Sequence, residues 1–503
     1  MLSLRAVRCA SQALLRQRRL VPLPESPLPA ASLAGHARWC STHSPLPKPA
    51  ADHRDIGVQQ ELFTTSIYSP GSPILLPNGA RIFNRLVDFL RKQYVHYGFQ
   101  EVITPTIYKK SLWAKSGHLE NYADDMFTVT SGSPARAENT GNSEQDEYGL
   151  KPMNCPGHCL IFASKLRSYR DLPIRYADFS PLHRNEISGA LSGLTRVRRF
   201  HQDDGHIFCR PVQIEEEIRK TLDFIRVAYS VFRLGPYRLA LSTRPADHYI
   251  GSLEDWSQAE GALRKALDAS GQDWTVKKGD GAFYGPKIDV ILKDSDGKEH
   301  QTATIQLDFQ LPKRFELEYQ APAPELEQKG ETTTDPELLA HLGPVRPVLI
   351  HRAVLGSVER LMALLIEHYD GKWPFWLNPR QGIILTVNDS EPVVEWSRAA
   401  QRVLLGTATN SAGDGPIKPS QLSIDIDDSA RSLPLKVREA KTKGYGVIVV
   451  VGPKNVAKGS VTVDATGIPR HGDGAAAPQA EKAREMTPKE LLEFLEAKVD
   501  SYQ

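Results

Sequence analysis

Residues 181–208 bring together side chains that suit a nucleotide triphosphate. Arg184 and Glu186 stand two residues apart at the start of this stretch, a Gly/Ser-rich loop and a basic run follow, and Phe200 stands near the end. Guanidinium groups match phosphate oxygens bidentately, a carboxylate can accept from a base edge, and an aromatic ring offers a face for stacking. Two β-strands joined by the long loop would place these groups on one sheet face. Strand alternation then predicts that Arg184 and Glu186 point together.

Three side chains that can ligate a metal are scattered along the chain. Cys155, His206 and His351 have no local partner at CxxC or HxxxH spacing, so spacing alone gives no zinc signal. A lone cysteine is most often a buried thiol, and a lone histidine is most often structural. His118 follows a glycine in a polar loop, where a histidine is most often just exposed. From these residues alone, a structural and a functional role both stay open.

The pattern around these groups predicts the elements that must position them. Apolar residues recur at helical spacing over residues 80–97, and Gly98 is placed to end that helix. Residues 99–104 are typical of a strand closed by Pro105. A second helix is expected over residues 354–369.

The last part of the chain alternates strand and helix patterns after a Pro-containing linker. Strands are expected at 382–387, 421–426 and 445–451, and helices at 391–405 and 435–443. Such alternation predicts an α/β domain with a mostly parallel sheet. The helix expected at 435–443 carries four basic residues that could face RNA phosphates or simply solvent: Lys436, Arg438, Lys441 and Lys443.

Length and composition bound the possibilities. The 503 residues allow two or three domains, and 62 Lys plus Arg against 60 Asp plus Glu give a net charge of only +2. A nucleic-acid partner would therefore have to be held by local basic clusters. Five irregularly spaced cysteines do not predict a disulfide framework and favour a reducing compartment. No run approaches the roughly 18 apolar residues of a membrane span.

Three segments are expected to lie outside the folded core. Residues 1–20 hold five arginines and no acidic residue, the composition of an organelle transit peptide, with a basic tail as the alternative. Residues 21–50 are rich in Pro, Ala and Ser and indicate a linker. Residues 131–148 are rich in Gly, Ser, Asn and acidic residues and predict an insertion between two strands.

At residues 181–208 the chain resembles motif 2 of the class II aminoacyl-tRNA synthetases, in the version of the threonyl-tRNA synthetase family. Six further blocks resemble that family in the family's order: DHRDIGVQQELF from Asp52, GHLENY from Gly117, KPMNCPGH from Lys151, GAFYGPKID from Gly281, QLDF from Gln306 and HRAVLGSVER from His351. Ordered blocks along a chain are far more specific than one short motif. The C-terminal part resembles the anticodon-binding domain of class IIa synthetases. It departs from the family where an Arg-rich strand end is usual, because residues 464–467 read DATG.

The resemblance implies the residues that bind ATP and act in catalysis. ATP is expected to contact Arg184, Glu186, Arg196, Phe200, Gln301, Thr304, Ser357 and Arg360. Arg184 would contact the α-phosphate and the substrate carboxylate, Glu186 the adenine edge and Arg196 the γ-phosphate. Phe200 and Arg360 would sandwich the adenine ring, and Mg²⁺ would bridge the phosphates. The residues implied in catalysis are Arg184, Arg360, Lys287 and His118, the last as a base or relay in transfer to tRNA.

The resemblance also implies a metal. The family binds zinc through a cysteine and two histidines that match Cys155, His206 and His351, so one substrate-recognising Zn²⁺ per chain is expected. In the family the ion takes the amino and hydroxyl groups of threonine, and the implied threonine pocket is completed by Gln202, Asp204, Tyr284 and Gln306. A site built around a substrate hydroxyl rejects an analogue lacking it, such as valine, by a factor of about 10⁴ to 10⁵. Serine lacks only a methyl group, worth about 1–3 kcal/mol, so its rejection is expected to be incomplete.

Three regions are therefore expected. They are a mitochondrial transit peptide and linker (1–50), an α+β class II catalytic domain with an antiparallel sheet and helices (51–379), and an α/β anticodon-binding domain (380–503). No editing domain is expected, because the catalytic match already begins at Asp52. The expected function is ligation of L-threonine to tRNA(Thr) in the mitochondrial matrix by a homodimer. A prolyl or seryl synthetase and a non-catalytic tRNA-binding paralogue are the alternatives.

Overall fold

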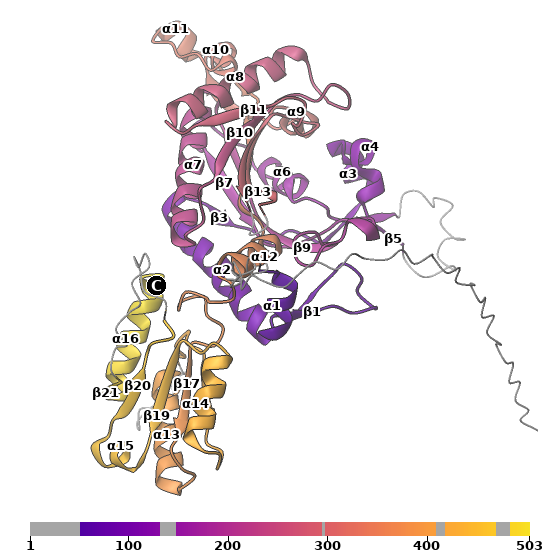
Figure 1. Cartoon of the computed structure of the whole chain (residues 1–503). Helices are drawn as coiled ribbons and strands as arrows, with labels where there is room; N and C mark the ends of the chain where they lie inside the picture. Colours follow the sequence, from indigo (N-terminus) through magenta and orange to yellow (C-terminus); the bar gives the residue numbers. More distant parts are fainter. Residues whose placement is uncertain (1–50, 131–146, 294–296, 409–417, 469–482) are drawn as a thin grey trace, which may run out of the picture. The chain divides into compact units, whose positions relative to one another are not determined.

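The larger folded part is built on one nine-stranded sheet (Figure 1). The computed structural model describes residues 51–130, 147–293, 297–408, 418–468 and 483–503, so both the expected transit segment and most of the expected insertion at 131–148 lie outside the described residues. The strand order is β11-β10-β12-β13-β16-β9-β7-β3, with β8 paired to β9. Every pairing is antiparallel except β3–β7 and β10–β11. The strands are β3 (Gln100–Glu101), β7 (Ile174–Asp178), β8 (Pro181–His183), β9 (Arg199–Cys209), β10 (Arg238–Ser242), β11 (Trp274–Lys277), β12 (Lys287–Lys293), β13 (Glu299–Asp308) and β16 (Val348–Ser357).

The two faces of this sheet pack against different helices. One face packs into a large apolar core with α2 (Pro77–Tyr97), α7 (Ile214–Val231), α8 (Leu253–Ala269) and α12 (Val358–His368). The alternate strand residues, such as Phe208 and Leu349, pack in a smaller cluster with α6 (Cys155–Ala163) and α9 (Gln310–Arg314). His206 and His351 each lie two residues from a member of that smaller cluster, so they share its face of the sheet.

Short elements complete this part of the chain. They are α1 (His53–Gln59), β1 (Phe63–Thr64), β2 (Ile74–Leu75), β4 (Ile107–Lys109), α3 (Lys110–Ser116), α4 (His118–Tyr122), β5 (Thr128–Val129), β6 (Tyr148–Leu150), β14 (Tyr319–Pro322), α10 (Pro324–Lys329), α11 (Pro336–Ala340) and β15 (Leu342–Val345). In the described part of the chain, no helix has both the length and the apolar character needed to cross a membrane.

The predicted helix and strand at residues 80–104 are confirmed in part. The α2 helix begins three residues earlier than predicted, and Gly98 ends it at φ 71° with its N–H donating to the Tyr94 carbonyl. The predicted strand over 99–104 is wrong in length, because only Gln100–Glu101 pair in the sheet. Beyond them Thr104 turns inward, where its hydroxyl donates to Asp178 at 2.6 Å, and Ile103 is left 88% exposed.

The start predicted for the helix at residues 354–369 is also wrong. Residues 354–357 are the last residues of β16, and the helix begins at Val358. Gly356 adopts φ 68° at the end of the strand, a conformation that glycine tolerates best. The Ser357 hydroxyl then accepts from the Arg360 N–H as the N-cap of α12.

The C-terminal part has its own five-stranded sheet and its own apolar core. The strand order is β18 (Ile424–Asp427), β17 (Gly382–Thr386), β19 (Val447–Val451), β20 (Val461–Asp464) and β21 (Arg484–Met486), with helices α13 (Glu391–Leu404), α14 (Leu433–Thr442), α15 (Pro453–Lys458) and α16 (Pro488–Asp500). β17 is parallel to both of its neighbours, whereas β19–β20 and β20–β21 are antiparallel. The three predicted strands pair in parallel, as expected, whereas β20 and β21 add two antiparallel pairings, so only half of the pairings in the whole sheet are parallel. The connection through the six-residue helix α15 is too short for a parallel crossover.

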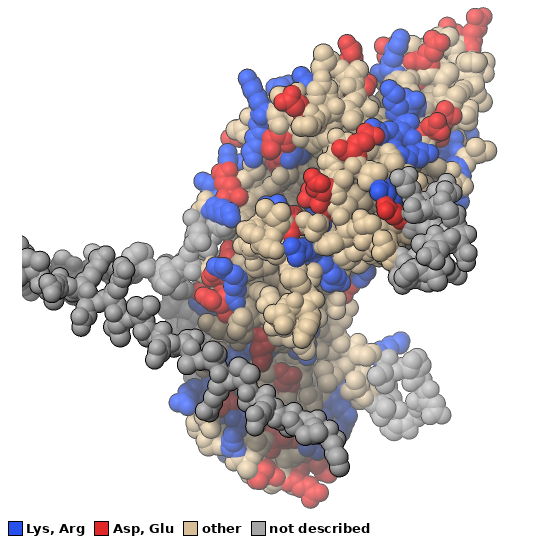
Figure 2. All heavy atoms as spheres, turned by 90° about the vertical axis from the view of Figure 1, so that its right-hand side faces the viewer, with Lys and Arg blue, Asp and Glu red and all other residues tan. Residues whose placement is uncertain are grey.

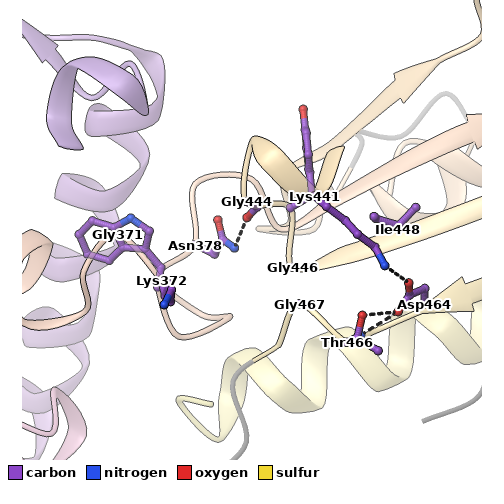
Figure 3. A pocket seen from close by; sticks show the side chains of 12 residues that line it. Gly371, Lys372, Asn378, Lys441, Gly444, Gly446, Ile448, Asp464, Thr466 and Gly467 are labelled. Carbon is purple, nitrogen blue, oxygen red and sulfur yellow. Dashed lines mark hydrogen bonds and ion pairs between the residues drawn. The ribbon is translucent and has the colours of Figure 1, made fainter. Parts of the chain in front are cut away.

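The basic residues predicted on α14 are only partly available to bind RNA. Lys436 is buried, and its ammonium group donates to Thr386 and to the Asp427 carbonyl. Lys441 lies 3.4 Å from Asp464 at the rim of a cavity of about 250 Å³ (Figure 3). Asp464 also accepts from the Thr466 backbone and hydroxyl, so the DATG segment forms a turn at the end of β20. Among the described residues, positive and negative side chains are interspersed over the face drawn in Figure 2.

Candidate active site

The strand register brings distant residues into rows across the large sheet. His206 of β9 lies directly opposite His351 of β16, and His351 lies directly opposite Gln306 of β13. Two residues further along the same strands, Asp204 and Thr304 both lie opposite Ala353. Residues directly opposite in an antiparallel pair share a face, with Cβ atoms about 4.5–5.5 Å apart. Antiparallel pairing therefore builds a polar surface from residues far apart in the sequence.

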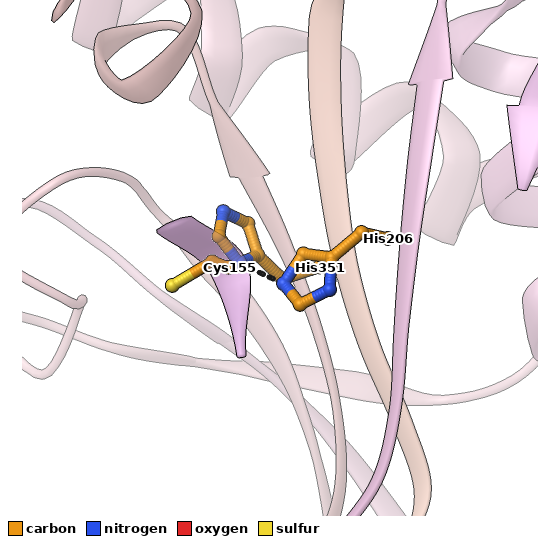
Figure 4. A group of neighbouring side chains, drawn as sticks. All are labelled: Cys155, His206 and His351. Carbon is orange, nitrogen blue, oxygen red and sulfur yellow. Dashed lines mark hydrogen bonds between the residues drawn. The ribbon is translucent and has the colours of Figure 1, made fainter. Parts of the chain in front are cut away.

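Cys155 joins the two histidines from the first turn of α6. The Cys155 Sγ and one ring nitrogen from each of His206 and His351 all lie within 4.8 Å of one another (Figure 4). His206 Nε2 and His351 Nδ1 are 3.0 Å apart. Two ligands of a tetrahedral zinc with Zn–N bonds of about 2.0 Å are separated by roughly 3.3 Å, so the pair needs little adjustment to share one ion.

The outer contacts of His351 suit a metal ligand. His351 Nε2 lies 2.8 Å from Asp308 Oδ2, and because a carboxylate only accepts, Nε2 carries the proton and Nδ1 keeps its lone pair. Burial raises the pKa of the Cys155 thiol well above its usual range, so a thiolate there requires a cation beside it. One thiol and two imidazoles fit zinc and leave coordination open. Asp308 was missed as a site residue, although it stands two residues after Gln306 in the QLDF block.

A cavity of about 280 Å³ opens beside this cluster. Its lining includes Gln202, Asp204, Tyr284 and Gln306, all four predicted to contact threonine. The Tyr284 hydroxyl donates to the Gln306 side-chain carbonyl, and Asn154 donates to Asp204 at 3.1 Å. Burial raises the pKa of Asp204. The size and polarity of this cavity suit a small amino acid.

A second cavity, of about 240 Å³, adjoins the first. Its lining includes all eight positions predicted to bind ATP: Arg184, Glu186, Arg196, Phe200, Gln301, Thr304, Ser357 and Arg360. The two cavities share Arg184, Gln202, Thr304 and Gln306. Arg184 thus lies where the two cavities meet.

The predicted reason for the placement of Arg184 and Glu186 is wrong. β8 ends at His183, so both residues belong to the loop and strand alternation does not align them. The loop is held at this point by the Arg184 N–H, which donates to the Arg198 carbonyl at 2.8 Å. The Glu186 carboxylate pairs with Arg196 at 2.7 Å, and the Arg184 guanidinium lies 5.0 Å from the Phe200 ring centre.

Arg360 is anchored at the far side of the second cavity. Its Nε donates to the Thr195 carbonyl at 3.0 Å, and its Nη1 donates to the Gln301 carbonyl at 3.1 Å. Burial, and then the charges of Arg184 and Arg196, lower its pKa. Several cations brought close together make this cavity a favourable place for an anion.

The remaining two predicted catalytic residues lie just outside the two cavity linings. His118 is fully buried, which contradicts the simple exposed interpretation, and its Nε2 lies 3.8 Å from the Cys155 Sγ. Burial is the main cause that lowers its pKa to about 3. The Lys287 ammonium lies 3.2 Å from Asp289 and 3.4 Å from the Gln301 side-chain oxygen, on the side of the second cavity.

A second group of possible metal ligands around His53 is engaged in hydrogen bonds instead. His53 Nε2 accepts from the Leu194 N–H at 3.2 Å, and its Nδ1 donates to Glu367 Oε1 at 2.7 Å. With both ring nitrogens engaged, His53 offers no lone pair to an ion. It ties α1 and α12 to the loop between β8 and β9.

The chain matches two family models. Residues 136–329 match the tRNA synthetase class II core domain (G, H, P, S and T), and residues 413–498 match an anticodon binding domain. Among solved structures, the RNA binding domain of threonyl-tRNA synthetase from Cryptosporidium parvum superimposes with a TM-score of 0.75 at 42% identity, over 89% of this chain and 98% of that one. A prolyl-tRNA synthetase from Giardia lamblia shares the fold, with a TM-score of 0.61 at 17% identity over 90% and 80%.

Curated relatives are more similar still. The chain is 50% identical to a probable mitochondrial threonine–tRNA ligase of Schizosaccharomyces pombe, over 82% of this chain and 84% of that protein. It is 46% identical to the mitochondrial threonine–tRNA ligase of Saccharomyces cerevisiae, over 81% and 85%. It spans only 52% of a mitochondrial threonine–tRNA ligase of Arabidopsis thaliana, at 49% identity. The chain therefore belongs to the threonine–tRNA ligase family of the class II aminoacyl-tRNA synthetases.

Proposed function

We propose that this protein joins L-threonine to tRNA(Thr) in mitochondria, through a threonyl-adenylate formed from ATP. The observation that carries this proposal is the pair of adjoining cavities, one polar and sized for an amino acid, the other lined by several arginines. Arg184 lines both, at the place where the amino-acid carboxylate must meet the α-phosphate. In-line attack needs mainly positioning and cations that stabilise the developing charge.

The residues of the second cavity have separate roles in this proposal. Glu186 accepts a hydrogen bond from the adenine edge. Phe200 and Arg360 stack on the two faces of the adenine ring, and hydrogen bonds to two backbone carbonyls already fix the Arg360 side chain. Arg196 binds the terminal phosphate. The Arg196 side of its ion pair with Glu186 is about half exposed, so releasing the pair costs about 1 kcal/mol. Gln301, Thr304 and Ser357 line the rest of the cavity, and Mg²⁺ bound with ATP supplies further charge neutralisation.

Cys155, His206 and His351 would hold one zinc ion. Bound there, the ion supplies a Lewis acid that takes the amino and hydroxyl groups of threonine. Asp204 would accept a hydrogen bond from that hydroxyl, and Gln202, Tyr284 and Gln306, which line the same cavity, would complete the pocket around the substrate. Asp204 and His206 stand two residues apart on β9, and His351 lies opposite His206 on β16, so these three side chains approach the substrate from one sheet face.

His118 and Lys287 complete the proposed machinery. His118 acts as a base or relay during attack by the tRNA ribose hydroxyl. Burial lowers its pKa and so keeps the ring neutral, with a nitrogen lone pair, at physiological pH. Lys287 is held by Asp289 beside Gln301, close to the expected phosphates.

Two further parts of the proposal concern the whole molecule. Residues 1–50 act as a mitochondrial presequence and linker, and the mature protein acts in the matrix as a homodimer. A subunit contact over α2 and the segment after β3 would cover Val95 and Ile103, which are 84% and 88% exposed. The C-terminal part binds the anticodon arm of the tRNA.

Amino-acid-dependent pyrophosphate exchange tests this function against the prolyl and seryl alternatives. We expect strong exchange with threonine, weak exchange with serine and none with proline or valine. Metal analysis of the same protein should give about one zinc per chain, lost together with threonine activation in Cys155→Ser. Exchange with proline, or full threonine activity without any metal, would refute the corresponding part of the proposal.

A further inference from the structure

His158 is a buried histidine that neither cavity contains and that the proposed reaction does not use. It lies on α6, three residues after Cys155, and is fully buried. Its Nδ1 lies 2.8 Å from Nδ1 of His206, and the two rings meet edge to face with centroids 4.6 Å apart. His158 therefore touches the side of His206 that faces away from the zinc ligands.

Two arrangements of protons compete in this chain of rings. In the first, His206 carries its proton on Nε2 and donates it to His351 Nδ1, which is 3.0 Å away, and no lone pair of His206 remains for a metal. In the second, His206 carries its proton on Nδ1 and donates it to His158, which leaves Nε2 as a lone pair facing the site. Only the second arrangement can bind zinc.

Asp178 favours the arrangement that can bind metal. Its Oδ2 lies 3.8 Å from His158 Nε2, too far for a direct hydrogen bond but close enough for its charge to favour a proton on that nitrogen. With the proton of His158 on Nε2, its Nδ1 can only accept, so His206 must donate.

Asp178 is itself fixed in place. It is fully buried and accepts from the Thr104 hydroxyl at 2.6 Å and from the Ser180 N–H at 2.7 Å. The buried ammonium of Lys151 lies 3.7 Å away and donates to the same Thr104 hydroxyl. This buried polar network holds the carboxylate against His158 and accounts for two residues of the KPMNCPGH block, Lys151 and His158, to which no role is otherwise given.

We propose that His158 is a positioning residue that fixes the tautomer and ring orientation of His206, so that Nε2 is available to the metal. This inference rests on the proposed zinc site. Outer contacts of ligand histidines typically change metal affinity by about 10- to 100-fold. Removing the acceptor should therefore weaken zinc binding by that factor, whereas a residue that serves only for packing would change stability alone.

The test compares two substitutions at this position in the purified protein. His158→Leu fills a similar space without an acceptor, and His158→Asn keeps an acceptor oxygen near the place of Nδ1. Zinc affinity is measured by competition with a chromophoric chelator. We expect affinity to fall about 10- to 100-fold in His158→Leu and to recover most of the way in His158→Asn. Phe162→Leu is the control. Phe162 lies one turn along the same helix, is buried in the smaller apolar cluster that also contains Cys155, and its variant should bind zinc as the wild type does.

The outcomes separate the two proposals. A wild-type protein that binds no zinc overturns the proposed metal site. A wild type that binds zinc, with His158→Leu folded and binding it equally tightly, overturns the role of His158 alone. If His158→Leu does not fold, ¹⁵N-histidine spectra of the zinc-bound wild type decide: protons on Nδ1 of His206 and Nε2 of His158 support the inference, and the reverse refutes it.

Discussion

Replacement of Asp308 by asparagine tests the tautomer argument at the other histidine ligand. Asp308 is fully buried, and each of its oxygens has a separate task. Oδ1 accepts from the backbone N–H groups of Gln310 at 2.6 Å and Leu311 at 3.0 Å, whereas Oδ2 accepts from His351 Nε2 at 2.8 Å. In Asp308→Asn, the single carbonyl oxygen must serve the two backbone donors, so the amide NH₂ turns toward His351.

The exchange should move a proton. An amide NH₂ only donates, so His351 Nε2 must accept, and the ring proton shifts to Nδ1, the nitrogen that faces His206. A protonated Nδ1 cannot ligate zinc. We expect zinc affinity to fall about 10- to 100-fold, which corresponds to about 1.4–2.7 kcal/mol. The fold should lose no more than about 1 kcal/mol, because the number of hydrogen bonds is unchanged.

Chelator competition measures the zinc affinity, and urea unfolding of the zinc-free protein measures the stability. Threonine KM in pyrophosphate exchange should rise with the loss of zinc and return toward the wild-type value at high zinc concentration. Asp289→Asn is a matched control for the zinc affinity only, since Asp289 is equally buried in the same sheet but does not touch His206 or His351. Unchanged zinc affinity in a folded Asp308→Asn protein would refute the reasoning.

Three further predictions follow from individual contacts. Gly193→Ala should lower the unfolding free energy by at least about 1–2 kcal/mol and raise the KM for ATP, because Gly193 has φ +46° and an added Cβ would lie 2.1 Å from His53 Nε2; a wild-type urea curve would contradict it. Stability should fall on acidification below pH 6.5 because burial lowers the pKa of His118 to about 3, so the unfolded chain binds a proton that the folded chain does not. The loss from this group is about 3 kcal/mol by pH 4, and His118→Gln should remove it from urea titrations at pH 7 and pH 4; an identical pH dependence would count against it. Glu186→Gln should raise the KM for ATP while leaving the unfolding free energy within about 1 kcal/mol of wild type, because the Arg196 side of the ion pair is half exposed and the amide keeps a hydrogen-bond acceptor for it; an unchanged KM would exclude the adenine-edge role.

Local sequence patterns predicted many of the helices and strands and most of the candidate site residues. Helical spacing and Gly98 predicted α2, and alternation in the C-terminal part predicted three of its strands and two of its helices to within a few residues, but not α15, β20, β21 or α16. Ordered sequence blocks indicated the family, and the residues they implied for ATP and threonine line two adjoining cavities. These features are local, since periodicity, caps and short blocks can be followed along the chain.

The assembly of the candidate site depends on strand register and long-range contacts. An apolar pattern predicts a strand but not its register, and here the register places His351 opposite His206 and beside Gln306. Long-range contacts also set the proton positions, since Asp308 and the pair of Asp178 and His158 determine which nitrogens stay free for a metal. Such contacts join residues far apart in sequence through geometry, so no spacing along the chain could reveal them.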